Sequence, residues 1–521
     1  MEGTFWAFMP AIIAILLALI TKQVYISLFF GIFVGAMMYA GGDPLKALFT
    51  LYQVMSEKVG SNTPIIVFLV VLGILVVLMQ KSGGAKAYGD WAGKKIKSKG
   101  GALAATAGLG CLIFVDDYFN CLTVGSVMRP VTDKFKISRS KLAYIIDATA
   151  APICIIAPIS SWAAAVAGEL EGDGLMVFIS TIPFNVYALL TIVMVFALCF
   201  FAFDFGKMKR NDVVAEKTGD VHAGVEADSK EDEVIISNSK GKVRHLLIPV
   251  IILIICCIGG MLYTGFFYNW DTGLIGKELQ SANFIEAFSN CDAGLSLAIG
   301  STVALFIIAI YYMVEKVVPF KDITGSFTEG FKAMVPAILI LTFAWSISGI
   351  MGAKGGYLDA QAFVQENLAN SAFPTFLFPA IFFILAGLIA FSTGTSWGTF
   401  GVLVPIAVTI LGGSGTAAIL TVSATLGGAV FGDHVSPISD TTILASAGAQ
   451  CNHVEHVNTQ LPYAALVADI AVVAYLVGGI CIGLGSVLSC IIMWIVALAL
   501  LACAIFVIRY LNNKKGNDIE E

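Results

Sequence analysis

The chain has 521 residues and a formal net charge of −6, and its composition is 58% hydrophobic but only 13% charged. Soluble chains carry about 25% charged residues, so this composition excludes a soluble fold, and the acidic balance argues against a nucleic-acid partner. The eleven cysteines mostly lie within apolar runs at no metal-ligand spacing, which indicates small buried hydrophobes rather than disulfides or metal ligands. We therefore expect an all-α polytopic membrane protein.

Apolar runs long enough to cross about 30 Å of hydrocarbon recur along the chain. In the first half they cover residues 4–21, 24–41, 64–80, 143–168 and 175–204. In the second half they cover residues 246–267, 293–314, 333–351, 416–448, 461–484 and 486–509. The N-terminus lacks the basic region and cleavage site of a signal peptide, so the first of these helices is expected to be retained.

Two further apolar stretches, 101–130 and 374–412, carry polar residues near their middles. Such stretches fit helical hairpins that enter and leave by the same face better than simple spans. Basic residues cluster on both sides of the first stretch, between 81 and 99 and between 134 and 141. Because short cytoplasmic loops collect Lys and Arg, both flanks are expected inside, as a re-entrant hairpin requires.

The basic residues also set the expected orientation of the chain in a cytoplasmic membrane. The N-terminus is expected outside. Residues 205–245 form a long hydrophilic stretch, which predicts a mobile cytoplasmic linker. Residues 485–521 are expected to add one C-terminal transmembrane helix and a cytoplasmic tail.

Residues 1–204 and 246–484 are expected to run in opposite orientations through the same order of elements: three helices, a hairpin, and a helix interrupted by proline. The sequences Ala157-Pro-Ile-Ser-Ser161 and Ser436-Pro-Ile-Ser-Asp440 occupy corresponding places; chance similarity between apolar helices is the alternative. The sequence therefore predicts two inverted-topology repeats with re-entrant helical hairpins and Pro-broken transmembrane helices. Many secondary transporters have this architecture, with substrate and coupling ion bound at the breaks.

The polar stretch Phe431-Gly-Asp-His-Val-Ser-Pro-Ile-Ser-Asp-Thr-Thr442 interrupts apolar sequence. An ionisable residue at bilayer depth is by default a functional candidate, and Pro437 favours a break whose carbonyls can hold a cation. The alternative is a helix end with polar caps in the headgroup zone. The candidates for binding a cation, a proton or a substrate are Asp433, His434, Ser439, Asp440 and Thr441, with Asp433 and Asp440 as the predicted Na⁺ ligands.

Further candidates lie in the hairpins and at the first break. Asp117 shares a helix face with Asn120; the alternative is a tip that reaches the aqueous edge. Asp147 precedes the first break, although it could instead pair with Lys141 or Arg139. The other candidates are Ser160 and Ser161 at the first break, Thr393, Ser396 and Thr399 at the second hairpin tip, and Trp397 and Trp162 as walls of a substrate pocket.

Two contacts between these candidates are expected if the repeat is functional. Ser160 and Ser161 should approach Asp117 and Asn120, as Ser439 and Asp440 should approach Ser396 and Thr399. In contrast, His453, Glu455 and His456 fall where a cytoplasmic turn is expected. They are therefore interpreted as a solvated turn or a mouth that handles protons, rather than as a metal site.

These motifs resemble those of the NhaC family of Na⁺/H⁺ antiporters. The residues that carry the resemblance are 431–442, the following Gln460-Leu-Pro-Tyr463, Phe391-Ser-Thr-Gly-Thr-Ser-Trp-Gly-Thr399 and Phe114-Val-Asp-Asp-Tyr-Phe-Asn120. The resemblance implies Na⁺-linked antiport across a bacterial cytoplasmic membrane and a layout of scaffold and transport domains that is often dimeric in the wider superfamily.

Two functions are compatible with these features. The first is Na⁺/H⁺ exchange by alternating access, with Na⁺ and H⁺ as coupling ions and no cofactor. The second is Na⁺- or H⁺-coupled transport of an amino acid or organic acid. The sequence has no nucleotide-binding loop and no recognisable pair of nucleophile and base, so an ATP-driven pump and an enzyme are not expected.

Overall fold

The computed structural model describes residues 3–520, except for 22, 171–173, 202, 226–239, 270–273, 277–278, 282–286, 288–290, 352–356, 361, 364–373 and 413–414. The first half contains α1 (Met9–Thr21), α2 (Val24–Tyr39), α3 (Pro44–Ser61), α4 (Thr63–Lys81), α5 (Gly84–Lys95), α6 (Lys99–Leu112), α7 (Asp117–Lys134), α8 (Arg139–Ala148), α9 (Ala151–Cys154), α10 (Ser161–Glu169), α11 (Gly174–Thr181) and α12 (Val186–Phe201), followed by α13 (Gly206–Thr218). The second half contains α14 (Arg244–Phe267), α16 (Ala293–Val314), α17 (Phe320–Met351), α19 (Phe378–Thr393), α20 (Ser396–Leu411), α21 (Thr416–Val435), α22 (Asp440–Ala449), α23 (His453–Ile480) and α24 (Ser486–Glu520). Two short strands, β1 (Tyr268–Asn269) and β2 (Leu274–Ile275), pair antiparallel.

Within the described residues, eight helices are long and apolar enough to cross a membrane, or nine if the two parts of α17, which meet at 43°, form one span. The runs predicted at 64–80, 246–267, 293–314 and 486–509 are confirmed as α4, α14, α16 and α24. The chain is therefore a nearly all-helical, multi-pass membrane protein.

Three of the predicted spans are not single helices. The run 143–168 is divided into α8, α9 and α10, and the run 416–448 into α21 and α22. The run 175–204 breaks at a 3₁₀ turn that contains Pro183. Proline explains these breaks because it lacks the backbone donor that a continuous helix needs.

Helix α3 was not among the predicted spans. It begins after Asp43, whose side chain accepts hydrogen bonds from the main-chain N–H groups of Leu45 and Lys46 at 2.9 and 3.2 Å. Its apolar residues Leu45, Phe49 and Tyr52 are 80%, 72% and 65% exposed. Hydropathy does not predict this helix, because polar residues interrupt its apolar run.

Helices α19 and α21 pack backbone to backbone. A Cβ added at Gly428 or at Gly432 would lie 2.2 Å from the main-chain oxygen of Phe383 or Gly387, respectively. Small residues allow this close approach, which is a common way of joining helices in membranes. The contact fixes one arm of the second predicted hairpin against the second broken helix.

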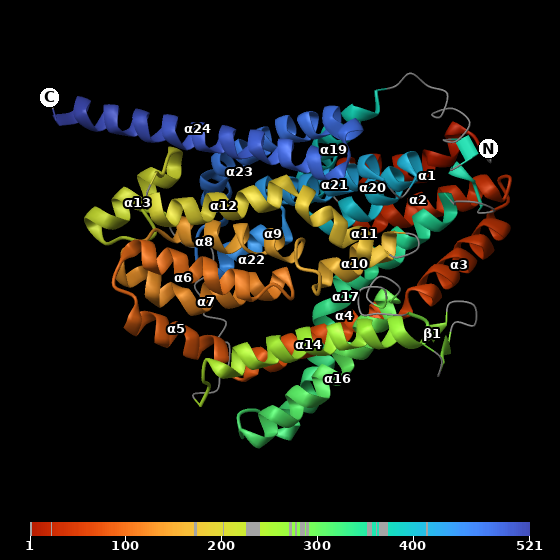
Figure 1. Ribbon diagram of the computed structural model, residues 1–521, viewed down its shortest axis with the longest axis horizontal. Coiled ribbons are helices and arrows are strands. Elements are labelled where there is room, and N and C mark those ends of the chain that lie inside the picture. Colours follow the sequence, from red (N-terminus) through yellow and green to blue (C-terminus); the bar gives the residue numbers. More distant parts are fainter. Residues whose placement is uncertain are drawn as a thin grey trace.

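The two ends of the molecule differ in the elements they carry. The N-terminal helices and β1 lie at one end, whereas α13 and the end of α24 lie at the other (Figure 1). Residues 206–218 of the predicted linker form a helix with buried Asn211 and Asp212, so this part of the linker is ordered. Residues 226–239 lie outside the described part of the chain.

The predicted hairpins correspond to α6 and α7, joined by residues 113–116, and to α19 and α20, joined by Gly394 and Thr395. By length and composition, Thr375–Thr393 could cross a membrane by itself. Re-entry of both hairpins by one face and the inverted relation of the two halves stay predictions.

Candidate functional site

The candidate site lies where two interrupted helices meet the loops of the two helix pairs. In the first half, Ser160 Oγ accepts a hydrogen bond from Ala163 N (3.0 Å) and caps α10. In the second half, Ser439 Oγ accepts one from Thr442 N (3.2 Å) and caps α22. The shared Pro-Ile-Ser sequence therefore performs the same local task in both halves: it ends one helical segment and caps the next.

Each break contacts the loop of the helix pair in its own half. Ser161 N donates to Val115 O (3.0 Å) in the loop between α6 and α7. Ser436 Oγ donates to Phe391 O (2.7 Å) near the end of α19. Gly394 has φ +69°, and a Cβ there would lie 2.4 Å from Ile438 O. Only glycine suits this position, since both the backbone conformation and the close approach exclude a side chain.

Asp147 is fully buried at the centre of the polar groups. Its Oδ2 accepts hydrogen bonds from Gln460 Nε2 (2.6 Å) and Thr442 Oγ1 (3.1 Å). It also lies 3.4 Å from His456 Nε2. The alternative partners of Asp147 are engaged elsewhere, because Lys141 pairs with Asp204 and Asp212, and Arg139 pairs with Asp133.

Asp433 is connected to Asp147 through two adjacent threonines. Thr441 Oγ1 donates to Asp433 Oδ2 (2.6 Å), while Thr442 Oγ1 lies within hydrogen-bonding distance of both Asp147 Oδ2 (3.1 Å) and Asp433 O (3.3 Å). The first turn of α22 thus connects a carboxylate from each half of the chain. A charge at this depth is tolerated only where it is paired or lines a wet cavity.

His434 and Gln460 close the other side of the cluster. Gln460 Nε2 donates to His434 O (2.6 Å), and His434 Nδ1 lies 3.1 Å from the hydroxyl of Tyr187 on α12. Several buried atoms here have no hydrogen-bond partner among the described residues: Asp147 Oδ1, His434 Nε2, His456 Nδ1 and Gln460 Oε1. Buried polar atoms of this kind call for water, an ion or a ligand.

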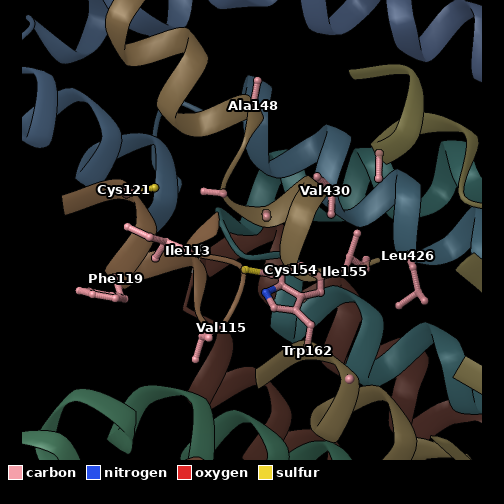
Figure 2. Close-up of a cluster of buried hydrophobic side chains, with 14 of the residues drawn as sticks. Ile113, Val115, Phe119, Cys121, Ala148, Cys154, Ile155, Trp162, Leu426 and Val430 are labelled. Carbon is pink, nitrogen blue, oxygen red and sulfur yellow. The ribbon is translucent and has the colours of Figure 1, made fainter. Parts of the chain in front are cut away.

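The carboxylates of the first helix pair lie near this cluster. Asp117 Oδ2 accepts a hydrogen bond from Trp162 Nε1 (3.1 Å). Cys121, which lies on α7 with Asp117, is fully buried. Figure 2 shows Cys121 and Trp162 in the buried apolar surroundings that α21 completes with Leu426 and Val430. The carboxylates of Asp116, Asp117, Asp147 and Asp433 are therefore all buried in the helical bundle.

Aromatic rings from both halves meet beside Asp117. The ring centroids of Trp162 and Trp397 are 5.6 Å apart, and Phe400 lies 5.3 and 5.7 Å from them. Trp397 Nε1 and Ser161 Oγ are buried with no hydrogen-bond partner in the described part of the chain. The two tryptophans are thus adjacent, as a shared pocket wall requires.

Asn120 and Ser160, which are expected to approach each other, both contact main-chain carbonyls. Asn120 Nδ2 lies within hydrogen-bonding distance of the carbonyls of Gly110, Ile113 and Thr149, at 2.7, 3.0 and 3.0 Å, and its two N–H groups can donate to two of them at a time. Ser160 Oγ donates to Cys154 O or Ala157 O at 2.7 and 3.0 Å. These two side chains therefore satisfy backbone carbonyls freed by the breaks, which competes with the contact expected between them.

The hydroxyls of the second pair also bind within their own elements. Thr393 and Thr399 donate to Ile389 O (2.8 Å) and Thr395 O (2.9 Å). Ser439 Oγ lies 3.1 Å from Thr441 Oγ1, and Ser396 is buried. The side chain of Asp440 lies outside the described part of the structure, so the predicted Na⁺ pair of Asp433 and Asp440 stays a prediction.

The interpretation of His456 as part of a solvated turn was wrong. Its side chain is fully buried beside Asp147, because α23 begins at His453 and carries His456 directly inward. His456 and Gln460 are four residues apart and share a helix face, a signal that could have identified both. Tyr187 gave no comparable signal, since it lies in an apolar run.

The described residues contain no group of three His, Cys, Asp or Glu side chains arranged to hold a metal ion. A cation in this cluster would therefore need hydroxyl, amide or main-chain oxygens besides the carboxylates. Hard cations such as Na⁺ accept all of these ligands.

A buried ionisable cluster at broken helices, inside an apolar helical bundle, is typical of membrane transporters. The sequence model of the Na⁺/H⁺ antiporter family matches residues 173–480. The chain therefore belongs to that family, whose members are transporters rather than enzymes.

The chain is also similar to individual proteins. A Haemophilus influenzae protein of uncharacterised function is 37% identical over 497 residues, which cover 92% of this chain and 91% of that protein. The malate-2H⁺/Na⁺-lactate antiporter of Bacillus subtilis is 32% identical over 146 residues, 27% of this chain and 29% of that protein. Among solved structures, the Alcanivorax borkumensis YdaH transporter superposes with a TM-score of 0.45 at 15% identity, covering 84% of this chain and 89% of that one.

Proposed function

We propose that the chain is a secondary antiporter that exchanges Na⁺ for H⁺ at the cluster around Asp147 and Asp433. The observation that carries the proposal is the bridge between two buried carboxylates from different halves by Thr441 and Thr442. A carboxylate that must lose its proton before it can hold Na⁺ makes the two cations compete for one site, and competition at a site open to alternate sides produces exchange.

The groups around the two carboxylates are suited to holding either a proton or Na⁺. Threonine hydroxyls that now donate to the carboxylates can rotate and offer their oxygens to Na⁺. Gln460 and His456 hold the Oδ2 side of Asp147, so its Oδ1 is the atom available for a proton or a cation. Asp440, at the first position of α22, would add a further carboxylate.

Transport in proteoliposomes with an internal pH dye tests this proposal. Asp147→Asn and Asp433→Asn each remove a negative charge with little change in size, so each should abolish the pH change that a Na⁺ gradient drives. Asp90→Asn, at an exposed position on α5, is the matched control and should transport normally. Near-wild-type exchange in both site variants would mean that the cation binds elsewhere.

The second candidate function is Na⁺- or H⁺-coupled transport of an amino acid or organic acid. The observation in its favour is the pair of buried, unpartnered groups Trp397 Nε1 and Ser161 Oγ beside the aromatic rings, since both can donate to a carboxylate. A relative is named as an antiporter of organic acids. Thermal-shift screening of hydroxy acids, dicarboxylates and amino acids separates the two functions: stabilisation by a solute that depends on Na⁺ favours the second.

The proposed cycle uses no cofactor and places the chain in a bacterial cytoplasmic membrane. The halves 1–204 and 246–484 would act as inverted repeats, with the N-terminus outside and the 205–245 linker and C-terminus inside, in a monomer or homodimer. Reporter fusions at the C-terminus, active only in the cytoplasm or only outside it, check this orientation.

A further inference from the structure

A second buried carboxyl group, Glu169, lies apart from the Asp147 cluster at the end of α10. Its side chain is 6% exposed, and neither carboxyl oxygen has a hydrogen-bond partner among the described residues. An isolated ionised carboxylate is costly in such surroundings, whereas the protonated form is tolerated far better. The function proposed above does not use this group.

Glu169 lies against the second half of the chain. A Cβ added at Gly401 on α20 would lie 3.7 Å from Glu169 Oε1 and 2.8 Å from Cβ of Ala344 on α17. The carboxyl group is therefore held where α10, α17 and α20 meet. Any change in its charge acts directly on a contact between the two halves.

Among the described residues, few charges face this position; Glu171 and Asp173, which follow closely in the chain, lie outside the described part. Helices α11 and α20 carry no charged residue, and on α4 and α17 the ion pair of Lys81 and Glu329 (2.9 Å) lies at the opposite end of both helices. On α16, Glu315 follows the far end, while Asp292 caps the near end. The basic group whose charge reaches Glu169 is Lys58 on α3.

A cavity of about 200 Å³ adjoins the same end of α10. Gly168 and Leu170, the neighbours of Glu169 in the chain, both line it, together with Ser61, Asn62 and Asp292. A second unpartnered buried group lies alongside: Trp345 Nε1, which is 3.1 Å from a Cβ added at Gly168. Polar walls and a volume several times that of one water molecule make this cavity suitable for water.

We propose that Glu169 is a second proton-binding site, held where α10, α17 and α20 meet and separate from the Asp147 cluster. The step is the simple equilibrium between a carboxylate plus a proton and the neutral carboxylic acid. The cavity beside Gly168 and Leu170, which Glu169 itself does not line, is the nearest space that could hold water to carry the proton. The contribution of Glu169 to transport rests on the exchange function proposed above; its protonation does not.

Infrared difference spectroscopy of the full-length purified protein during a pH titration tests the protonation directly. The wild type should show a carbonyl band of a buried protonated carboxyl group that Glu169→Gln removes and Glu169→Asp shifts. Glu216→Gln, at an exposed position, is the control and should leave the band unchanged. A band that persists in folded Glu169→Gln would overturn the proposal.

Transport assays then test the coupling separately. Glu169→Gln should lower the Na⁺-driven proton flux at least several-fold, and Glu169→Asp should restore part of it. Normal flux in Glu169→Gln with the band lost would overturn the role in transport. The two proposals can fail separately. If Glu169→Gln removes the band but Asp147→Asn still exchanges Na⁺ and H⁺, the Glu169 proton site stands and only the function proposed for the Asp147 cluster is contradicted.

Discussion

At the scale of single residues, the cluster depends on neutral side chains as much as on charged ones. Thr441, Thr442 and Gln460 supply the donors that keep Asp147 and Asp433 in place. Hydrogen bonds to charged groups contribute about 1.5–3 kcal/mol each. Neutral donors can therefore set the affinity of the site without adding charge to the bilayer interior.

Thr442→Val tests this role because valine keeps the shape of threonine and removes only the hydroxyl. Loss of the bridge to Asp147 should raise the Na⁺ concentration for half-maximal exchange by about tenfold, the equivalent of about 1.4 kcal/mol. Thr425→Val is the matched control, since the Thr425 hydroxyl donates only within its own helix, to Thr421 O (2.8 Å). An unchanged Na⁺ dependence in Thr442→Val would remove the threonine from the site.

Gln460→Ala should instead act on stability. Gln460 Nε2 serves both Asp147 Oδ2 and His434 O, so its loss leaves two buried acceptors without this donor. Each unsatisfied group costs about 1–3 kcal/mol, and the melting temperature in detergent should fall measurably. Leu461→Ala, at an exposed position on the same helix, should have a smaller effect. A smaller fall in melting temperature for Gln460→Ala than for Leu461→Ala would show that water replaces the amide.

The sequence revealed those site residues that stand out within an apolar run. Asp433, His434 and Thr441 were predicted from one polar stretch, and Asp147 from its isolated charge. His456 was missed because its meaning depends on where α23 begins, which local sequence does not show. The role of Asn120 in binding stays a prediction: its amide nitrogen lies near three backbone carbonyls, while its Oδ1 has no hydrogen-bond partner among the described residues.

At the scale of elements, close helix contacts hold the site together. α21, which carries Asp433, meets α19 through Gly428 and Gly432. Gly428→Ala should therefore destabilise the protein by about 1–3 kcal/mol, since the new Cβ would lie 2.2 Å from Phe383 O. Gly60→Ala on α3, where nothing lies within 4 Å of the added carbon, is the control. Equal unfolding temperatures for the two variants would contradict the packing argument.

Helix α13 covers the end of α8 through buried charges. Lys141, whose side chain is 2% exposed, lies 2.6 Å from Asp204 and 3.2 Å from Asp212, and Asp212 also pairs with Lys99 at 2.8 Å. Lys141→Met would remove this partner from the carboxylates of Asp204 and Asp212, which are largely buried. Removing one member of a buried pair costs about 3–5 kcal/mol, and thermal unfolding should report it. Lys97→Met, at an exposed position, should leave the unfolding temperature unchanged.

At the scale of the whole molecule, the predicted membrane class and the spans of α4, α14, α16 and α24 are confirmed, because hydropathy alone determines them. The interruptions also follow from sequence, since proline and polar residues prevent a continuous helix. The relation between the halves is harder to predict: it depends on contacts between distant parts of the chain, such as that of Thr442 Oγ1 with Asp147 Oδ2, and such contacts leave little trace in local sequence. The inverted repeat therefore stays a prediction.

Alternating access requires the broken helices and hairpins to move against the helices that surround them. Ala344 on α17 and Gly401 on α20 lie at such a boundary: their Cβ atoms would be 2.8 Å apart, and a disulfide, which needs about 3.5–4.5 Å, would form after a small separation of the helices. Oxidation of the Ala344→Cys, Gly401→Cys double variant should therefore stop Na⁺-driven exchange, and reduction should restore it.

The matched control is the Thr264→Cys, Ser296→Cys pair, which joins α14 to α16 where the two hydroxyls are 2.5 Å apart. Both helices lie at the edge of the molecule opposite α24 (Figure 1), so this crosslink should leave exchange intact, as should oxidation of the wild type with its native cysteines. Complete crosslinking of positions 344 and 401 with undiminished exchange would mean that α17 and α20 move together, and the moving boundary would then have to lie between other helices.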